Sequence, residues 1–351
     1  MSNQRGCGLP HKPVQRKTAG GSAGISTIVS AAVSAVVLGA WSAAALMVAP
    51  AMAADNFPQR EIRLIVPWNA GGSNDIAARV LQPILAENGL RIIVDNVPGG
   101  TGAIGLNRVA TSEPDGYTLG MGTSSTLAII AQGKTPLKNE QFTHIARVST
   151  DPLLLLVSAN GPKDLDAFIA QMKKNPGKTT IGTPGTYNVN HIFAAMTARA
   201  AGVDYVNVPY PGGAKVITDL AGGQIEAAVL KPSESISQIK VGQVRAIGVF
   251  SNERLTVFPD VPTFKEKGYD VFPFGPVVQM AYIVGPAKLP PDVREKLIAG
   301  FRKSIQDPRF KAFANDNGVL VDDLTGAALD KEVADVQKSL NAVATQVFKP
   351  E

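Results

Sequence analysis

The chain of 351 residues contains one cysteine and three histidines, and each scarcity excludes a class of site. Cys7 has no second cysteine to pair with, so no disulfide can form within the chain. Only His144 and His191 follow residue 53. We therefore expect no zinc or copper site and no metal-dependent chemistry built on cysteine or histidine, whereas an oxygen-only calcium site stays open.

The sequence also lacks the short motifs of several enzyme classes. It has no G-x-S-x-G turn, no G-x-x-x-x-G-K-[ST] loop and no H-E-x-x-H helix, so it offers no hydrolase nucleophile, no P-loop and no zinc-protease site of these kinds. We predict that the protein is not an enzyme, has no catalytic residues and needs no cofactor.

The first 53 residues have the pattern of an export signal. Arg5, Lys12, Arg16 and Lys17 form a positive leader, an uncharged run of 23 residues follows at 25–47, and Ala51-Met52-Ala53 has the small-x-small form that signal peptidase cuts. We predict a signal peptide over 1–53, cleaved after Ala53, and a periplasmic protein. The alternative is an uncleaved membrane anchor, because a run of this length can span a bilayer.

Cleavage would change the charge balance. The leader holds four of the 34 Lys and Arg residues and none of the 29 Asp and Glu residues, so residues 54–351 carry a net charge of about +1, the difference between 30 and 29. A nearly neutral chain gives no electrostatic reason to bind nucleic acid, and we expect no nucleic-acid partner.

After the leader, short apolar runs alternate with segments of helical periodicity, which indicates an α/β protein with parallel sheets. Its length suits two lobes with a cleft between them. The predicted strands are 62–67, 91–96, 118–122, 153–157, 179–182, 205–209, 225–230, 244–250 and 277–284. The predicted helices are 74–88, 165–175, 191–201, 214–221, 291–306 and 326–344.

A near-repeat stands out in this pattern. Val66-Pro67-Trp68 is followed by Gly71-Gly72 and a helix, and Val208-Pro209-Tyr210 is followed by Gly212-Gly213 and a helix. Glycines before a helix let backbone N–H groups approach an anion at the helix N-terminus. Each turn alone is an ordinary strand-to-helix connection. Two copies, one in each presumed lobe, favour an anion site between them.

The chain resembles the substrate-binding receptors of tripartite tricarboxylate transporters, the Bug-type receptors, over nearly all of residues 57–345. The resemblance is carried by these segments, in this order: Phe57-Pro58, Ile62-Arg63-Leu64-Ile65-Val66-Pro67, Gly71-Gly72-Ser73-Asn74-Asp75, Asn96-Val97-Pro98-Gly99-Gly100-Thr101-Gly102-Ala103-Ile104-Gly105, Pro114-Asp115-Gly116-Tyr117-Thr118-Leu119, Gly122-Thr123, His191, Val208-Pro209-Tyr210, Gly212-Gly213, Asp219-Leu220, Gly222-Gly223-Gln224 and Pro259-Asp260-Val261-Pro262-Thr263.

The resemblance implies a type II periplasmic binding fold: two Rossmann-like lobes, two crossover strands as the hinge, and a small carboxylate held between them. Lobe 1 would comprise 54–155 and 273–351, and lobe 2 would comprise 156–272. It also implies a solute receptor, expected to be monomeric, that delivers its ligand to the membrane subunits of a tripartite tricarboxylate transporter. A receptor of the same fold that serves a sensor kinase or another transporter is the alternative.

In this family the carboxylate is usually held by backbone N–H groups, hydroxyls and waters, which agrees with the helix N-termini found above. The ligand-binding residues that we predict are Gly72, Ser73, Asn74, Thr123, Ser124, Thr183, Gly185, Thr186, Tyr187, His191, Tyr210, Gly213 and Lys231. His191 is expected to line the site without acting as a base, and Asp75 is expected to be structural because it would repel a carboxylate.

Lys231 is a departure from the family pattern. The family commonly has an aspartate and a small polar residue where this chain has Leu230 and Lys231. If that aspartate met a ligand amino group, its loss argues against an amino acid ligand, and Lys231 could pair with a further anionic group. Equally, Lys231 could extend into solvent at the strand end. The segment Phe272-Pro273-Phe274-Gly275-Pro276, where relatives often have a tryptophan, is a second departure.

A nucleotide-dependent enzyme is the remote alternative. Gly100-Thr101-Gly102-Ala103-Ile104-Gly105 matches G-x-G-x-x-G and follows a predicted strand. A dinucleotide site also needs an acidic residue about 20 positions later, and none lies between Asp115 and Glu140.

Overall fold

The computed structural model describes residues 57–275 and 277–348. The predicted leader and its cleavage site after Ala53 lie outside these residues, as does Pro276 of the unusual segment. Among the described residues, no helix has the length and apolar character needed to cross a membrane.

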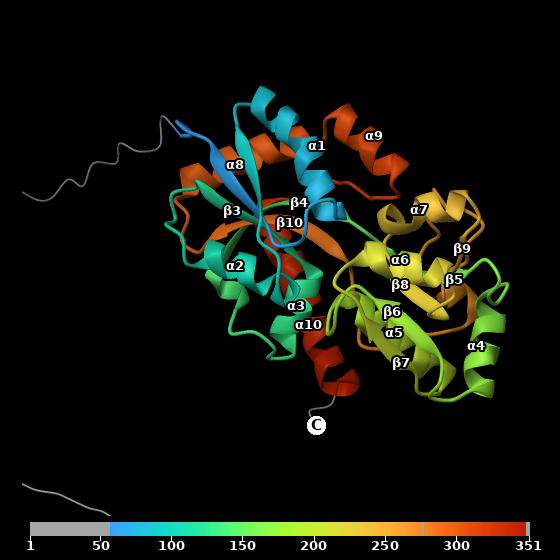
Figure 1. The fold of residues 1–351 in the computed structure, drawn as a ribbon. Coiled ribbons are helices and arrows are strands. Elements are labelled where there is room, and N and C mark those ends of the chain that lie inside the picture. The colour runs from blue at the N-terminus through green and yellow to red at the C-terminus, as the bar shows by residue number, and fades with distance from the viewer. Residues whose placement is uncertain (1–56, 276, 349–351) are drawn as a thin grey trace, which may run out of the picture. The chain divides into compact units, whose positions relative to one another are not determined.

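The first sheet has the strand order β2-β1-β3-β10-β4 (Figure 1). β1, β2 and β3 are parallel, and β10 runs antiparallel to both of its neighbours, β3 and β4. The inner strand β1 is a largely buried apolar run, as expected of a strand covered on both faces, whereas the edge strand β2 is only partly buried. Their bounds are β1 Ile62–Val66, β2 Ile92–Asn96, β3 Thr118–Thr123, β4 Phe142–Thr150 and β10 Met280–Pro286.

The second sheet repeats this plan in the order β7-β6-β8-β5-β9. Here β6, β7 and β8 are parallel, and β5 runs antiparallel to β8 and β9. The bounds are β5 Leu153–Ser158, β6 Thr180–Thr183, β7 Val206–Pro209, β8 Ala227–Leu230 and β9 Val244–Phe250. The two-lobed α/β architecture expected from the sequence is therefore present.

Two connections join the sheets, and each delivers the antiparallel strand of the sheet it enters. The chain leaves β4, turns at Asp151 and Pro152, and enters the second sheet as β5; it returns after β9 and enters the first sheet as β10. Because β5 begins at Leu153, the predicted lobe boundary after residue 155 falls inside this strand. The assignment of residues to lobes stays a prediction.

The helices cover both sheets. Four of them, and strand β4, were not among the predicted elements; β4 was missed because His144 and Arg147 interrupt its apolar residues. Around the first sheet lie α1 Ser73–Glu87, α2 Ala103–Ala110, α3 Ser124–Ala131, α8 Pro291–Ile305, α9 Pro308–Asp316 and α10 Gly326–Val347. Around the second lie α4 Leu165–Lys174, α5 Val189–Ala201, α6 Gly213–Ala221 and α7 Pro232–Lys240.

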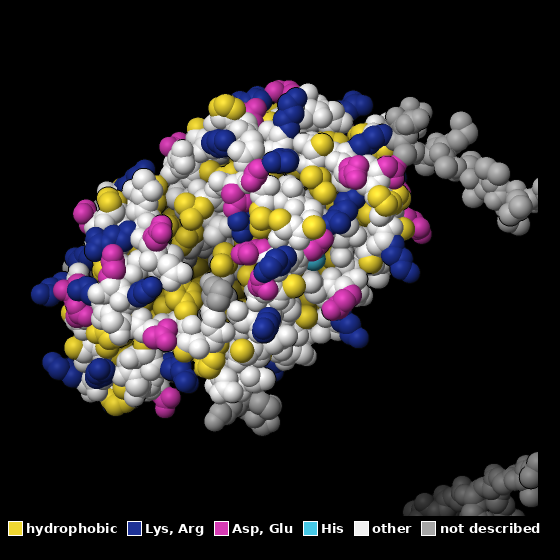
Figure 2. Space-filling view, turned by 180° about the vertical axis from the view of Figure 1, so that it is seen from behind, with side chains coloured by type: hydrophobic (Ala, Val, Ile, Leu, Met, Phe, Trp, Pro, Cys, Tyr) yellow, Lys and Arg dark blue, Asp and Glu magenta, His cyan; other side chains and the backbone are white. Residues whose placement is uncertain are grey.

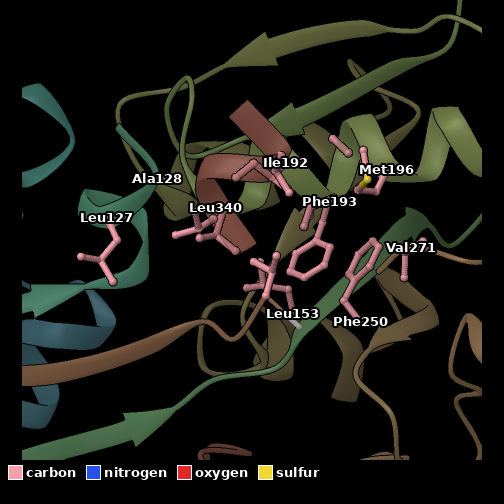
Figure 3. Close-up of a cluster of buried hydrophobic side chains, with 14 of the residues drawn as sticks. Leu127, Ala128, Leu153, Ile192, Phe193, Met196, Phe250, Val271 and Leu340 are labelled. Atoms are coloured by element: carbon pink, nitrogen blue, oxygen red, sulfur yellow. The ribbon is translucent and has the colours of Figure 1, made fainter. Parts of the chain in front are cut away.

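One apolar cluster extends across both sheets. Leu127 of α3 and Leu340 of α10 belong to the same buried cluster as Leu153 of β5, Phe193 of α5 and Phe250 of β9 (Figure 3). The Phe193 and Phe250 rings are stacked, with centroids 4.5 Å apart. Since α10 contacts both α3 and α5, the C-terminal helix packs on both parts of the molecule.

Gly105 in α2 allows the helix to pack closely on the end of β1. A Cβ at this position would lie 2.6 Å from Pro67 Cβ and 2.8 Å from the Val97 carbonyl oxygen. We expect Gly105→Ala to destabilise the protein by about 1 to 3 kcal/mol in urea unfolding, although alanine normally favours a helix. Gly222→Ala, where the added Cβ meets nothing closer than 3.4 Å, is the control and should be nearly neutral. Equal stabilities of the two variants would contradict this account.

Candidate functional site

The helix N-termini that follow the parallel strands converge near the two connections between the sheets. Lys231 lies there, at the end of β8 and the N-cap of α7. Its Nζ donates to Ser73 Oγ at the start of α1 (3.2 Å) and to Asp151 Oδ2 at the turn after β4 (3.2 Å). Lys231 thus links both sheets and one of their connections.

Lys231 does not extend into solvent, which was one of the two interpretations of the sequence. Its side chain is only 7% exposed and that of Asp151 only 3%, so the two form a buried ion pair. Ser149 Oγ donates to Asp151 Oδ2 (2.8 Å) and further satisfies the carboxylate. A buried ammonium needs such a counter-ion, because leaving it unpaired would cost several kcal/mol.

Glu234 lies beside this pair, in the first turn of α7. Its Oε2 accepts the backbone N–H of Lys231 (3.1 Å). Its other oxygen lies against the backbone of Gly213 at the start of α6, where an added Cβ would lie 2.6 Å from Glu234 Oε1. Burial raises the pKa of the Glu234 carboxyl, although Lys231 opposes this effect. The α6 N-terminus, predicted as an anion site, is therefore next to a carboxyl group of the protein itself.

The start of α1 has an acidic residue of its own as well. Asp75 accepts hydrogen bonds from the Gly71 N–H, from Arg79 and from Asn96. Burial raises the pKa of Asp75, but these hydrogen bonds outweigh it and hold the pKa below its usual value. Asp75 thus orders the turn that carries the predicted residues Gly72, Ser73 and Asn74.

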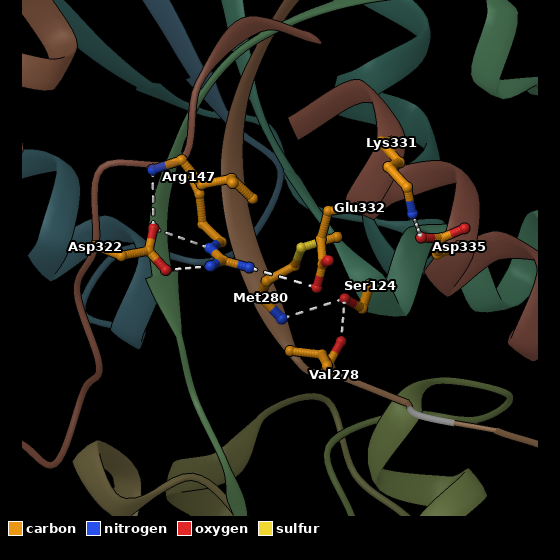
Figure 4. Close-up of polar contacts among 9 residues, drawn as sticks. Ser124, Arg147, Val278, Met280, Asp322, Lys331, Glu332 and Asp335 are labelled. Atoms are coloured by element: carbon orange, nitrogen blue, oxygen red, sulfur yellow. Dashed lines mark hydrogen bonds and ion pairs between the residues drawn. The ribbon is translucent and has the colours of Figure 1, made fainter. Parts of the chain in front are cut away.

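Thr123 and Ser124 end β3 and begin α3. Ser124 Oγ donates to the Val278 carbonyl oxygen and accepts the Met280 N–H, so it fastens the start of β10 (Figure 4). Thr123 Oγ1 is buried and has no hydrogen-bond partner in the structure. Of these two hydroxyls, only that of Thr123 is left without a protein partner.

Four more predicted residues lie at the end of β6 and in the turn after it, and His191 lies in the first turn of α5. Thr183 Oγ1 lies within hydrogen-bond distance of the Gly185 carbonyl oxygen (2.8 Å) and Asn207 Oδ1 (3.0 Å). The hydrogen bonds of Gly185 are local ones to Thr183 within this turn, where Gly185 has φ +122°. Tyr187 packs on Phe348 near the C-terminal end of α10.

His191 belongs to that aromatic group. Its ring centroid is 4.7 Å from that of Phe348, and its Nδ1 accepts the Tyr187 N–H (3.0 Å). None of its hydrogen-bond or ring contacts is with Ser73 or Lys231. Two groups of predicted residues are therefore brought together: Ser73 and Gly213 lie beside Lys231 and Glu234, and Tyr187 lies beside His191.

The near-repeat does not mark equivalent positions in the two sheets. β1 lies inside the first sheet, whereas β7, which ends in the second copy, lies at the edge of the second sheet and corresponds to β2. Tyr210 follows β7 and is a hydrogen-bond partner of Asp219. The counterpart of β1 is β6, whose turn has no Pro-aromatic-Gly-Gly pattern, so the sequence repeat arose from local turn chemistry.

The glycine-rich loop after β2 is shielded by neighbouring side chains. A Cβ at Gly102 would lie 2.9 Å from Thr126 Oγ1 and 3.2 Å from the Trp68 ring. The third glycine, Gly105, serves the helix packing described above. Bulky groups thus occupy the space on the Gly102 side that a pyrophosphate would approach in a dinucleotide site.

Three polar residues at the site were missed in the sequence: Ser149, Asp151 and Glu234. Ser149 and Asp151 lie at the end of β4 and just after it, the strand that was not predicted, so their place beside the hinge could not be inferred. Glu234 had a detectable signal, since a glutamate three residues after the N-cap, with proline at the first helical position, is typical of a helix start.

A cavity of about 490 Å³ lies at the hinge, next to Val278, whose carbonyl oxygen accepts the Ser124 hydroxyl. Thr150 and Pro152, which flank Asp151 in the chain, line it together with Phe193, Phe250 and Phe272. None of the thirteen predicted ligand-binding residues is among its lining residues. Within the described residues, no group of three or more His, Cys, Asp or Glu side chains is arranged to hold a metal ion.

Comparison with known families decides the relationship. Residues 77–346 match the family model described as the tripartite tricarboxylate transporter family receptor. The chain belongs to this receptor family. Among curated proteins, it is 34% identical over 246 residues to the protein BugT of Bordetella pertussis, covering 68% of this chain and 75% of BugT. It is also 32% identical over 281 residues to a UPF0065 protein of Cupriavidus necator, covering 78% of this chain and 83% of that relative.

Solved structures of the receptor family have the same two-sheet fold. MatC from Rhodopseudomonas palustris, with bound malate, is 27% identical and has a TM-score of 0.75, covering 82% of this chain and all of MatC. The periplasmic binding protein BugD is 26% identical with a TM-score of 0.74, covering 84% of this chain and 98% of BugD. The family is thus one of periplasmic solute-binding receptors, and the type II periplasmic binding fold is confirmed.

His191 gives the receptor a pH dependence that does not involve the Lys231 site. Burial lowers the pKa of His191 to about 4. The unfolded chain therefore binds a proton near pH 6.5 that the folded protein does not, so stability is full above pH 6.5 and falls between pH 6.5 and about 4. We expect His191→Gln to reduce the loss of unfolding free energy between pH 7 and pH 4.5 by about 2 kcal/mol, measured by urea unfolding. Parallel pH profiles would show that His191 is not the group responsible.

Proposed function

We propose that the protein is an exported receptor that closes its two lobes around a small carboxylate and delivers it to the membrane subunits of a tripartite tricarboxylate transporter. The observation that carries this proposal is the contact of Lys231 with Ser73, because it joins the N-termini of α7 and α1 at a buried point between the two sheets. A ligand bound there contacts both lobes and stabilises the closed arrangement.

The ligand carboxylate in this proposal lies near Lys231 Nζ, Ser73 Oγ and the N–H groups at the start of α1. An ammonium and a helix N-terminus are both favourable partners for an anion. The buried hydroxyl of Thr123, which lacks a partner, supplies a further donor. Malate bound to MatC supports an organic acid as the class of ligand.

The remaining features also fit a freely diffusing periplasmic receptor. Side chains of both signs are interspersed over the face shown in Figure 2, as expected for a chain of almost zero net charge after cleavage. We assign lobe 1 to 54–155 and 273–351 and lobe 2 to 156–272, except that all of β5, which pairs within the second sheet, belongs to lobe 2. We take the working form to be a monomer.

Cleavage of the leader is directly testable. The protein recovered from the periplasm should begin at Ala54, because Ala51-Met52-Ala53 supplies the cleavage pattern. N-terminal sequencing of the protein released by osmotic shock measures this. Recovery of the uncleaved chain in the membrane fraction would instead establish the leader as an anchor.

A ligand should raise the thermal stability of residues 54–351. We expect one class among mono-, di- and tricarboxylates, amino acids and aromatic acids to raise the melting temperature by several degrees at millimolar concentration, since a ligand at about 100 times its Kd adds about 2.7 kcal/mol. Differential scanning fluorimetry measures the shift. Stabilisation by NAD alone, or chemical conversion of an acid, would contradict a receptor function.

The double variant Lys231→Gln with Asp151→Asn tests whether Lys231 belongs to the ligand site. It replaces the buried ion pair with neutral side chains that can still hydrogen-bond, so no buried charge is left unpaired. The ligand-induced shift should disappear in this variant, and Lys215→Gln, on exposed α6, should retain it. An unchanged shift in the double variant would remove Lys231 from the site.

A further inference from the structure

The charges buried around Lys231 restrict the charge of a ligand that binds there. Lys231 is the one lysine or arginine with less than a tenth of its surface exposed among residues 57–275 and 277–348. Its positive charge is already balanced by Asp151, whose carboxylate lies 3.2 Å away. A ligand carboxylate that approaches Lys231 therefore meets a neutral pair, not a free cation.

Glu234, which lies against the start of α6, also contributes to the net charge around Lys231. The positive charge of Lys231 lowers the pKa of the Glu234 carboxyl, whereas burial, the largest effect, and the negative charge of Asp151 raise it. Asp75, the other acidic residue near these helix starts, is neutralised by Arg79. The cluster of Lys231, Asp151 and Glu234 consequently has zero net charge when Glu234 is protonated and −1 when it is ionised.

We propose that this cleft selects ligands that carry one carboxylate, either monocarboxylates or amino acids, and discriminates against di- and tricarboxylates. The inference rests on the proposed receptor function. One carboxylate is accepted by Lys231, Ser73 and the start of α1. A second one is repelled by the Asp151 carboxylate in a partly desolvated space, and by Glu234 whenever that carboxyl is ionised.

The same geometry removes the sequence argument against an amino acid ligand. That argument rested on the missing aspartate at position 230, yet Asp151 and Glu234 place two carboxyl groups within the same cluster. A ligand ammonium directed toward them would be favourable, because an opposite charge at short range stabilises both ions.

The experiment compares ligands of matched length at pH 7.5. Butyrate, succinate and 4-aminobutyrate form one series, and hexanoate, adipate and 6-aminohexanoate form another, each titrated into residues 54–351 by isothermal calorimetry. Within at least one series, we expect the monocarboxylate or the amino acid to bind at least tenfold more tightly than the dicarboxylate.

Glu234→Gln tests the source of the discrimination. The glutamine carbonyl can still accept the Lys231 N–H, so the start of α7 is preserved while the charge is removed. We expect the ratio between the two ligand classes to fall by about tenfold. Glu266→Gln is the matched control, since Glu266 also accepts a backbone N–H, from Thr263, but at an exposed turn. It should leave the ratio unchanged.

The outcomes distinguish a failure of the charge limit from a failure of the receptor function. A dicarboxylate that binds as tightly as its matched partners, or an unchanged ratio in Glu234→Gln, overturns the charge limit while the receptor function stands. Binding of none of the six compounds, together with no thermal shift from any acid in the wider panel, overturns the receptor function itself.

Discussion

The buried ion pair between Lys231 and Asp151 is the contact on which the arrangement of the cleft depends. An ammonium taken out of water has to be neutralised, and the carboxylate that neutralises it lies at the turn where the chain crosses from the first sheet to the second. Lys231 comes from the far sheet, and its other partner, Ser73, begins the first helix. The contacts of the Lys231 ammonium group thus connect three segments that lie far apart in the sequence.

The strand order explains why these segments can meet. Each sheet has three parallel strands followed by an antiparallel strand that arrives from the other sheet, so the carboxyl ends of β1, β3, β6 and β8 face the two connections. Helices begin at these ends, and their N-terminal N–H groups create a positive potential there. Carboxyl groups of the protein lie at two of these helix starts: Asp75, paired with Arg79, in α1 and Glu234 in α7.

The two groups of predicted site residues have different physical roles in this arrangement. The group around Lys231 is polar, buried and connected to the hinge. The group around Tyr187 and His191 is aromatic and packs against the end of α10, so it joins the C-terminal helix to the second sheet. Burial lowers the pKa of His191, which is consistent with a packing residue and with the expectation that it does not act as a base.

The sequence by itself determined the α/β class, most strands and helices, the turns at glycine and proline, and the receptor family, because periodicity and turn chemistry are properties of short segments. Tertiary structure decided the rest. Strand β4 could not be predicted because it contains His144 and Arg147, whose polar groups are satisfied by distant residues. His144 pairs with Asp330, and Arg147 pairs with Asp322 and Glu332, all more than 170 residues later in the sequence. The near-repeat proved to be local turn chemistry at non-equivalent strands. The environment of Lys231 is set by two residues that are distant in the sequence: Asp151, 80 residues earlier, is its counter-ion, and Ser73, 158 residues earlier, accepts its second hydrogen bond. No local pattern encodes such pairings, since they follow from how the sheets bring distant charges together in a space that excludes water.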